Sequence, residues 1–214
     1  MKKVAVIVFV LGCFFQSFSQ EEKTKSKVFF GIKAGVNALK LSEHEDKTLS
    51  FGFQVGTTLT VPISKRFAFQ PEVLLQIVNY SEKSNEIFDN GYIINEESIK
   101  NTLLLIPLNF KYAISKKVDI DLGPTVGFFV KTDRSQVITQ NIDGDVVVFN
   151  FDYDDDPYAK KTPLALAANL GVNYNFTDTI YAGLRYSLFI GKFQTLDRTI
   201  DNSLFALSVG YSLK

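Results

Sequence analysis

The chain of 214 residues carries 23 basic and 23 acidic side chains, so its formal net charge at pH 7 is zero. A chain without excess positive charge has no electrostatic reason to bind nucleic acid, and we expect no nucleic-acid partner. With one cysteine and one histidine, it has no material for a disulfide framework and little for a metal centre or a catalytic triad.

The first twenty residues, MKKVAVIVFVLGCFFQSFSQ, have the features of a secretory signal peptide. A basic start is followed by an apolar run and by small residues just before Gln20. We therefore predict a signal peptide over residues 1–19, a short periplasmic segment over 20–27 and one β-barrel domain over 28–214. The sequence leaves open whether Cys13 is lipidated, because VLGC resembles a lipoprotein box.

Beyond the signal peptide, apolar and polar residues alternate with a period of two, as in strands that have one apolar face. The expected strands cover residues 28–37, 49–62, 66–80, 99–114, 118–131, 162–176, 180–192 and 203–213. They are roughly 10 to 16 residues long, whereas strands of soluble proteins average about 5 or 6. Tight turns alternate with long polar connections, which predicts an antiparallel up-and-down meander.

Two of the long connections contain hairpin signals of their own. The tripeptides Asp89-Asn90-Gly91 and Asp143-Gly144-Asp145 are typical of type I′ turns, and Ile, Val and Phe residues flank them. We therefore expect the connections over residues 81–98 and 132–161 to continue as ribbons beyond the barrel.

The two faces of the expected strands differ in composition. One face is bulky and apolar, and its aromatic residues near the tight turns suit a girdle at a membrane interface. The other face carries amides, charged groups and nine glycines, which relieve crowding inside a narrow barrel. This pattern predicts lipid outside and small or polar residues inside. The predicted fold is all-β, an eight-stranded antiparallel up-and-down transmembrane β-barrel.

Four charged residues fall on the face predicted to line the lumen: Lys33, Glu72, Lys111 and Arg185. An eight-stranded barrel is just wide enough for its own side chains, so each of these groups needs an opposite charge or an amide partner. We expect Glu72 to pair with Arg185, Lys33 or Lys111 in a structural network. The sequence does not decide whether the lumen conducts ions.

An acidic segment, FDYDDDP, lies in the third long connection. Its carboxylates are Asp152, Asp154, Asp155 and Asp156. Such a cluster could hold Ca²⁺ or a basic partner, but it lacks the regular ligand spacing of a calcium loop. The lone His44 stands in a polar segment without a nucleophile, so we assign no metal, no cofactor and no catalytic residue, and predict that the protein is not an enzyme.

Five segments resemble, in the right order, the PorT-like outer-membrane β-barrel family of Bacteroidetes. The run LLLIPLNFKY at residues 103–112 is similar to the IPL-x-x-KY strand of that family. The segments GIKAGVN, FAFQPEVLL, LGPTVGFFV and AGLRYSLFIG resemble its first, third, fifth and seventh strands.

The resemblance implies an OmpA/OmpX-like eight-stranded barrel in the outer membrane of a Gram-negative cell. It also implies contact with outer-membrane lipid and insertion by the barrel assembly machinery, although the last strand, SVGYSLK, ends on Lys214 rather than on an aromatic residue. A structural or interaction role, with a protein partner at the extracellular loops and a link to secretion or surface-protein assembly, is expected by analogy. The alternative is a soluble periplasmic lipocalin-like barrel that carries a small apolar ligand.

Overall fold

The computed structural model describes residues 27–40, 49–154, 164–190, 194–195, 198–199 and 203–213. The predicted signal peptide with Cys13, residues 20–26 and His44 lie outside the described residues. Within the described part of the chain, no helix is long and apolar enough to cross a membrane.

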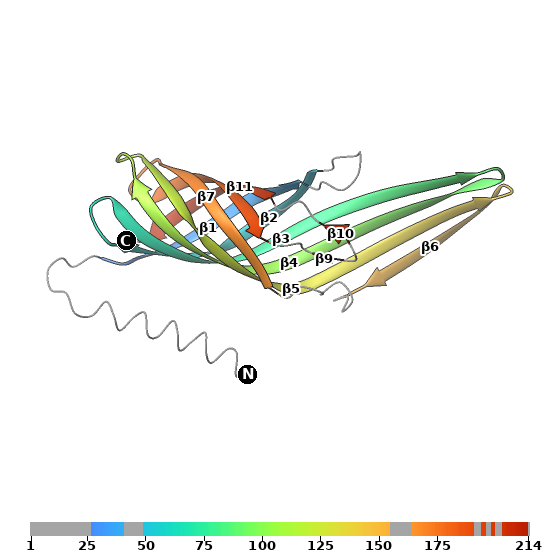
Figure 1. The fold of residues 1–214 in the computed structure, drawn as a ribbon, viewed down its shortest axis with the longest axis horizontal. Helices are drawn as coiled ribbons and strands as arrows, with labels where there is room; N and C mark the ends of the chain where they lie inside the picture. Colours follow the sequence, from blue (N-terminus) through green and yellow to red (C-terminus); the bar gives the residue numbers. More distant parts are fainter. Residues whose placement is uncertain are drawn as a thin grey trace, which may run out of the picture.

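Eight long strands form one closed ring (Figure 1). They are β1 (Phe29–Lys40), β2 (Leu49–Pro62), β3 (Phe67–Phe88), β4 (Gly91–Ala113), β5 (Val118–Ile142), β7 (Leu164–Asn175), β8 (Ile180–Ile190) and β11 (Ser203–Leu213). Neighbours follow the order β4-β3-β2-β1-β11-β8-β7-β5, and the pairing of β4 with β5 closes the ring. Every neighbouring pair is antiparallel. The predicted eight-stranded antiparallel barrel is confirmed.

Three tight turns at one end of the barrel share one local design. In each turn the hydroxyl oxygen of Ser64, Ser115 or Thr177 accepts hydrogen bonds from the backbone N–H groups two and three residues later. Serine and threonine favour turns because their side chains can replace a backbone acceptor in this way. We call this end of the barrel the turn end.

At the opposite end, β3, β4 and β5 run on past the barrel and are joined by β6 (Asp145–Tyr153) (Figure 1). This extension sheet comprises residues 79–88, 91–101, 132–142 and 145–153. The two ribbons predicted here are confirmed where the chain is described, but they merge into one sheet because β4 and β5 pair up to the tips. A separate two-stranded sheet is formed by β9 (Gln194–Thr195) and β10 (Arg198–Thr199).

Only one of the two predicted type I′ turns has that geometry. Asp143 and Gly144 have φ angles of 53° and 92°, and a type I′ turn requires positive φ at both central residues. The Asp89-Asn90-Gly91 connection has no positive φ, so the prediction of its turn type is wrong. Its glycine instead permits a close approach, because a Cβ atom there would lie 1.8 Å from a carbonyl oxygen of β5.

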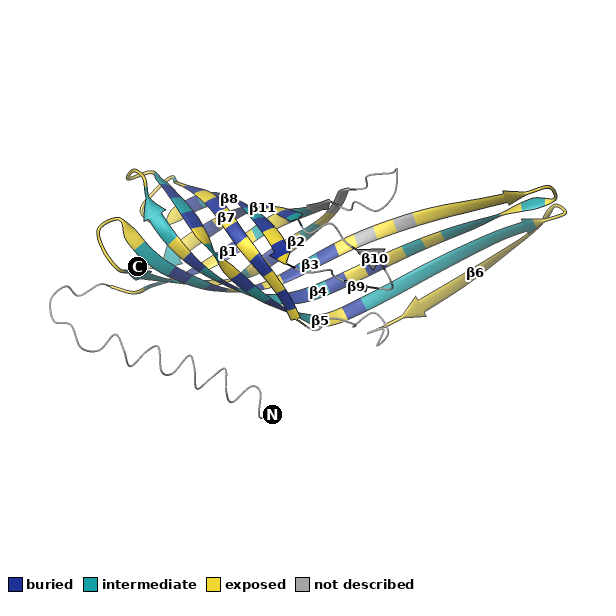
Figure 2. Cartoon of the chain, in the orientation of Figure 1, coloured by how far each residue is buried: buried dark blue, intermediate teal, exposed yellow. Residues whose placement is uncertain are grey.

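Exposed and buried residues alternate along the barrel strands, as Figure 2 shows. On β7, Leu166, Leu170 and Val172 are exposed, whereas Ala167, Asn169 and Gly171, which alternate with the outward-facing residues, are buried in the lumen. Exposed apolar side chains continue around all eight strands. A patch of this extent exceeds what water-soluble monomers expose, which favours the predicted contact with lipid.

Candidate functional site

Glu72 is the centre of a charged network in the lumen. Its side chain, on β3, is fully shielded from solvent. The guanidinium of Arg185 on β8 donates two hydrogen bonds to the carboxylate, from Nη1 to Oε2 at 2.9 Å and from Nη2 to Oε1 at 2.8 Å. The Nζ atom of Lys33 on β1 lies 3.3 Å from Oε2. One carboxylate therefore joins three strands across the lumen.

Amide side chains complete the environment of Glu72. Gln70 Nε2 donates to Glu72 Oε1 at 2.9 Å, and Asn109 Nδ2 donates to the same oxygen at 3.3 Å. These amides are held in turn, because Thr60 donates to Gln70 and Asn169 donates to Asn109. A buried carboxylate is stable only when such partners replace its hydration, so the network has the form of a structural element.

The sequence offered Lys111 as one of three alternative partners of Glu72, but Lys111 does not contact Glu72. Its Nζ atom lies 3.0 Å from Asp119 Oδ1, nearer the turn end, and 5.1 Å from the centre of the Tyr181 ring. Whether Lys111 reaches Glu72 or Asp119 depends on how far β4 is staggered against β3 and β5. No local pattern in the sequence sets this stagger.

Asn173 connects the two charged groups of the lumen. Its Nδ2 atom donates to Asp119 Oδ1 at 2.8 Å and to Asp121 Oδ2 at 2.7 Å, and Asp121 Oδ1 lies 3.5 Å from Arg185 Nη2. The charges of the connected network balance. Its cations are Lys33, Lys111 and Arg185, and its anions are Glu72, Asp119 and Asp121. A neutral, mutually paired network leaves no excess charge to attract an ion.

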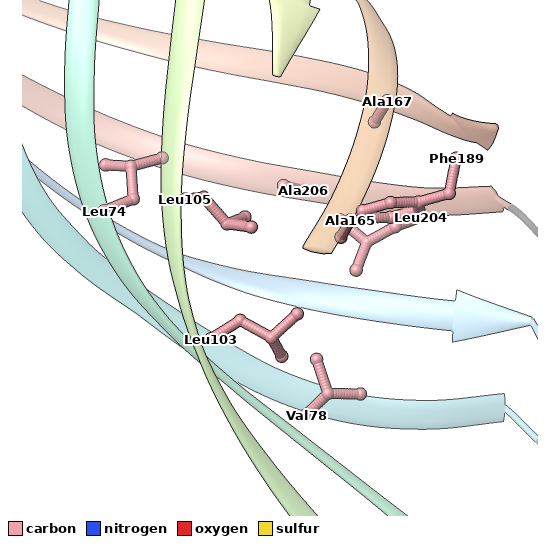
Figure 3. Close-up of a cluster of buried hydrophobic side chains, with 9 residues drawn as sticks. All are labelled: Leu74, Val78, Leu103, Leu105, Ala165, Ala167, Phe189, Leu204 and Ala206. Carbon is pink, nitrogen blue, oxygen red and sulfur yellow. The ribbon is translucent and has the colours of Figure 1, made fainter. Parts of the chain in front are cut away.

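An apolar layer fills the lumen on the side of the extension sheet (Figure 3). Its members are Leu74, Val78, Leu103, Leu105, Ala165, Ala167, Phe189, Leu204 and Ala206. Sequence reasoning missed this layer, because it predicted only small or polar residues inside. The clearest signal was the run LLLI at residues 103–106, where both strand faces are apolar.

Between the charged network and the apolar layer lies a cavity of about 10 Å³. Gln54, Gln76 and Arg185 are among its lining residues. This volume is room for about one water molecule. The described part of the lumen is therefore filled by side chains, as expected for eight strands.

Tyr181 is a further lumen residue that sequence reasoning missed. Its ring lies against Gly210 of β11, where an added Cβ atom would lie 2.1 Å from the ring carbon Cζ. We expect Gly210→Val to lower the free energy of unfolding by about 1–3 kcal/mol through overpacking. The measurement is the urea midpoint of the folded band on an unheated SDS gel.

Val209→Ile is the matched control for this prediction, because Val209 adjoins Gly210 but faces outward. It adds one methylene that meets no lumen side chain, and we expect its midpoint to equal that of the wild type. A Gly210→Val protein with an unchanged midpoint would contradict the packing of Tyr181 described here.

The acidic segment is only partly described. Asp152, on β6, accepts a hydrogen bond of 2.7 Å from Ser135 Oγ, and Asp154 is exposed. Asp155 and Asp156 lie outside the described residues. Within the described ranges, no group of three or more His, Cys, Asp or Glu side chains could hold a metal ion. Binding of Ca²⁺ or of a basic partner by this segment stays a prediction.

The strand β6 forms a free edge of the extension sheet. Within the described chain it pairs only with β5, and all nine of its residues are exposed. Apolar side chains point to both of its faces, with Val146 and Val148 on one and Val147, Phe149 and Phe151 on the other.

A sequence profile described as "Outer membrane protein beta-barrel domain" matches residues 18–193. The chain belongs to this family. Membership places the barrel in the outer membrane. In outer-membrane barrels the short turns face the periplasm and the longer connections face outward, so the turn end is periplasmic and the extension sheet is extracellular.

Several solved outer-membrane proteins are similar to this family member. Ail, the attachment invasion locus protein of Yersinia pestis, shares 12% identity over 87% of this chain and 99% of its own, with a TM-score of 0.47. Neisserial surface protein A (NspA) shares 13% identity over 86% and 96%, with a TM-score of 0.39. CarO of Acinetobacter baumannii shares 11% identity over 86% and 97%, with a TM-score of 0.41. No curated protein sequence matches the chain.

Proposed function

We propose that the chain is an outer-membrane interaction barrel, with a sealed lumen and an extension sheet that binds a protein partner. The observation that carries this proposal is the free edge of β6. Natural proteins protect such edges with lysine, proline, bulges or a covering segment, but DVVVFNFDY contains neither lysine nor proline. An exposed apolar strand with an open edge is suited to pair with a strand of another protein.

A photo-crosslinking residue placed at Val148 on β6 tests the proposal in intact cells. The matched control carries the same photo-crosslinking residue at Leu122, which is also exposed but lies on the apolar outer face of the barrel. We expect an adduct with a protein of discrete mass from Val148 and none from Leu122. Identical patterns from the two positions would contradict a partner at the extension sheet.

The two lumen layers support a role other than transport, and this leads to a prediction about conductance. Purified protein inserted into planar bilayers is expected to give no steady unit conductance, because the charged network and the apolar layer both block the lumen. A wide-pored barrel inserted in the same way is the positive control. Reproducible conductance steps would contradict the sealed lumen.

The finer assignment to the PorT-like family, with a role in secretion or surface-protein assembly, rests on the strand motifs and is part of the proposal. Its test compares the surface proteins of cells that lack the chain with those of cells that carry it.

The lumen carboxylates are held by cations or amides, which suits a structural network better than an acid–base centre. The soluble lipocalin-like alternative is not favoured, because the chain belongs to an outer-membrane family.

A further inference from the structure

We infer that the periplasmic turn end of the barrel binds the headgroups of anionic phospholipids through a cluster of basic side chains. This basic rim consists of Lys27, Lys65, Arg66, Lys116 and Lys117, all of them exposed. The inference depends on the outer-membrane location of the barrel and not on the proposed protein partner.

The pairing of β3 with β4 gathers four of these cations on one side of the rim. The two turns that carry them, residues 63–66 and 114–117, are adjacent, because the N–H of Ala113, directly before the second turn, donates to the carbonyl oxygen of Arg66 in the first turn at 2.8 Å. They lie far apart in the sequence, so only the barrel topology reveals one patch with four positive charges.

Lys27 adds a fifth cation beside the first of these turns. It stands two residues before Phe29, which pairs with Thr60 of β2, and this register places it near the end of β2, where the turn begins. The third turn, next to Lys117 around the rim, carries Asp178 in place of a basic pair. The positive charge is therefore concentrated on one side of the rim.

The cations of the basic rim have no acidic partner in the part of the chain that the structure describes. Within the described residues, none of them forms a salt bridge. The extension sheet shows the opposite arrangement, since Lys83 pairs with Glu96 and Arg134 pairs with Glu97. The basic rim thus presents unpaired positive charge, and the extension sheet largely does not.

The basic rim lies at the depth of lipid headgroups. Phe67 and Tyr112, directly beside it, have ring centres 4.9 Å apart, and aromatic residues of this kind mark the membrane interface. Arg66 Nη1 donates to the hydroxyl oxygen of Tyr112 at 3.3 Å, which holds the guanidinium at that level. Because the patch continues the lipid-facing surface, its occupant is a phospholipid phosphate and not a soluble anion.

The test measures lipid selectivity with the complete barrel in phosphatidylcholine vesicles. Spin-labelled phosphatidylglycerol or phosphatidylcholine is added, and the fraction of label immobilised at the protein gives the relative association constant. We expect the wild type to prefer phosphatidylglycerol about fivefold at low salt, and the preference to fall as salt screens the charges.

The variant K65Q/K116Q/K117Q keeps the Arg66–Tyr112 contact but removes three cations of the basic rim, and its preference is expected to fall below about twofold. The control K83Q/K100Q/K131Q removes three lysines from the extension sheet and the adjoining part of β5, and it should retain the wild-type preference. Both changes alter the net charge equally, so only the position of the charge differs.

Every protein is first shown to be folded by its mobility on an unheated SDS gel, and K116Q/K117Q replaces the triple variant if that variant does not fold. A wild type without preference, or an equal loss of preference in both triple variants, would overturn the inference.

Discussion

Replacing Glu72 by glutamine is expected to lower the free energy of unfolding by about 3–5 kcal/mol. The substitution keeps the size of the side chain but removes its charge, and so leaves Lys33 and Arg185 buried beside a neutral amide. Breaking a buried ion pair costs far more than the pair contributes, because the remaining charges lose hydration without a counter-charge. The effect is measured by urea unfolding in lipid vesicles. Circular dichroism monitors the unfolding, because the chain has no tryptophan for fluorescence.

Glu96→Gln is the control for this prediction, because Glu96 forms an exposed ion pair with Lys83 on the extension sheet. Its removal should cost less than about 1 kcal/mol. The charge-free combination Lys33→Met, Glu72→Leu and Arg185→Met should recover much of the loss caused by Glu72→Gln. A Glu72→Gln protein as stable as the Glu96→Gln protein would contradict the role of the lumen network.

Replacing Leu184 by arginine is expected to destabilise the barrel by about 2–4 kcal/mol. Leu184 lies in the middle of β8, between Val172 of β7 and Leu207 of β11, and its side chain points away from the lumen. A guanidinium at this position would lie among hydrocarbon chains, where its charge has no hydration. The readout is again urea unfolding in lipid vesicles.

Val148→Arg is the matched control, because Val148 and Leu184 are exposed to nearly the same extent, 53% and 55%. Only their surroundings differ, since Val148 lies on the extension sheet in water. A surface substitution in water usually changes stability by less than about 0.5 kcal/mol, and we expect no more here. Equal effects at the two positions would show that the barrel surface at Leu184 does not face lipid.

The strand pattern was enough to predict the barrel and the orientation of its faces. Along β7 the alternation is unbroken, and the small or amidic residues of that strand line the lumen as expected. The same alternation placed Lys33, Glu72 and Arg185 on the face that lines the lumen. Their meeting at one carboxylate follows from barrel closure, which brings β1, β3 and β8 around a narrow lumen.

Features that depend on pairing between distant strands could not be predicted from local patterns. The apolar layer was missed because the run over residues 103–106 is apolar on both faces. Alternation therefore does not show which of its side chains point into the lumen. The merged extension sheet requires β4 to pair with β5 far beyond the barrel. The basic rim likewise needs two turns that only the pairing of β3 with β4 brings together.

The decisive experiment is a cell fractionation followed by an SDS gel of the detergent-extracted protein, run with and without heating. A closed barrel in the outer membrane should be found in the membrane fraction, resist SDS until heated, and change mobility between the two lanes. A protein in the soluble fraction with the same mobility in both lanes would contradict the lipid-facing barrel.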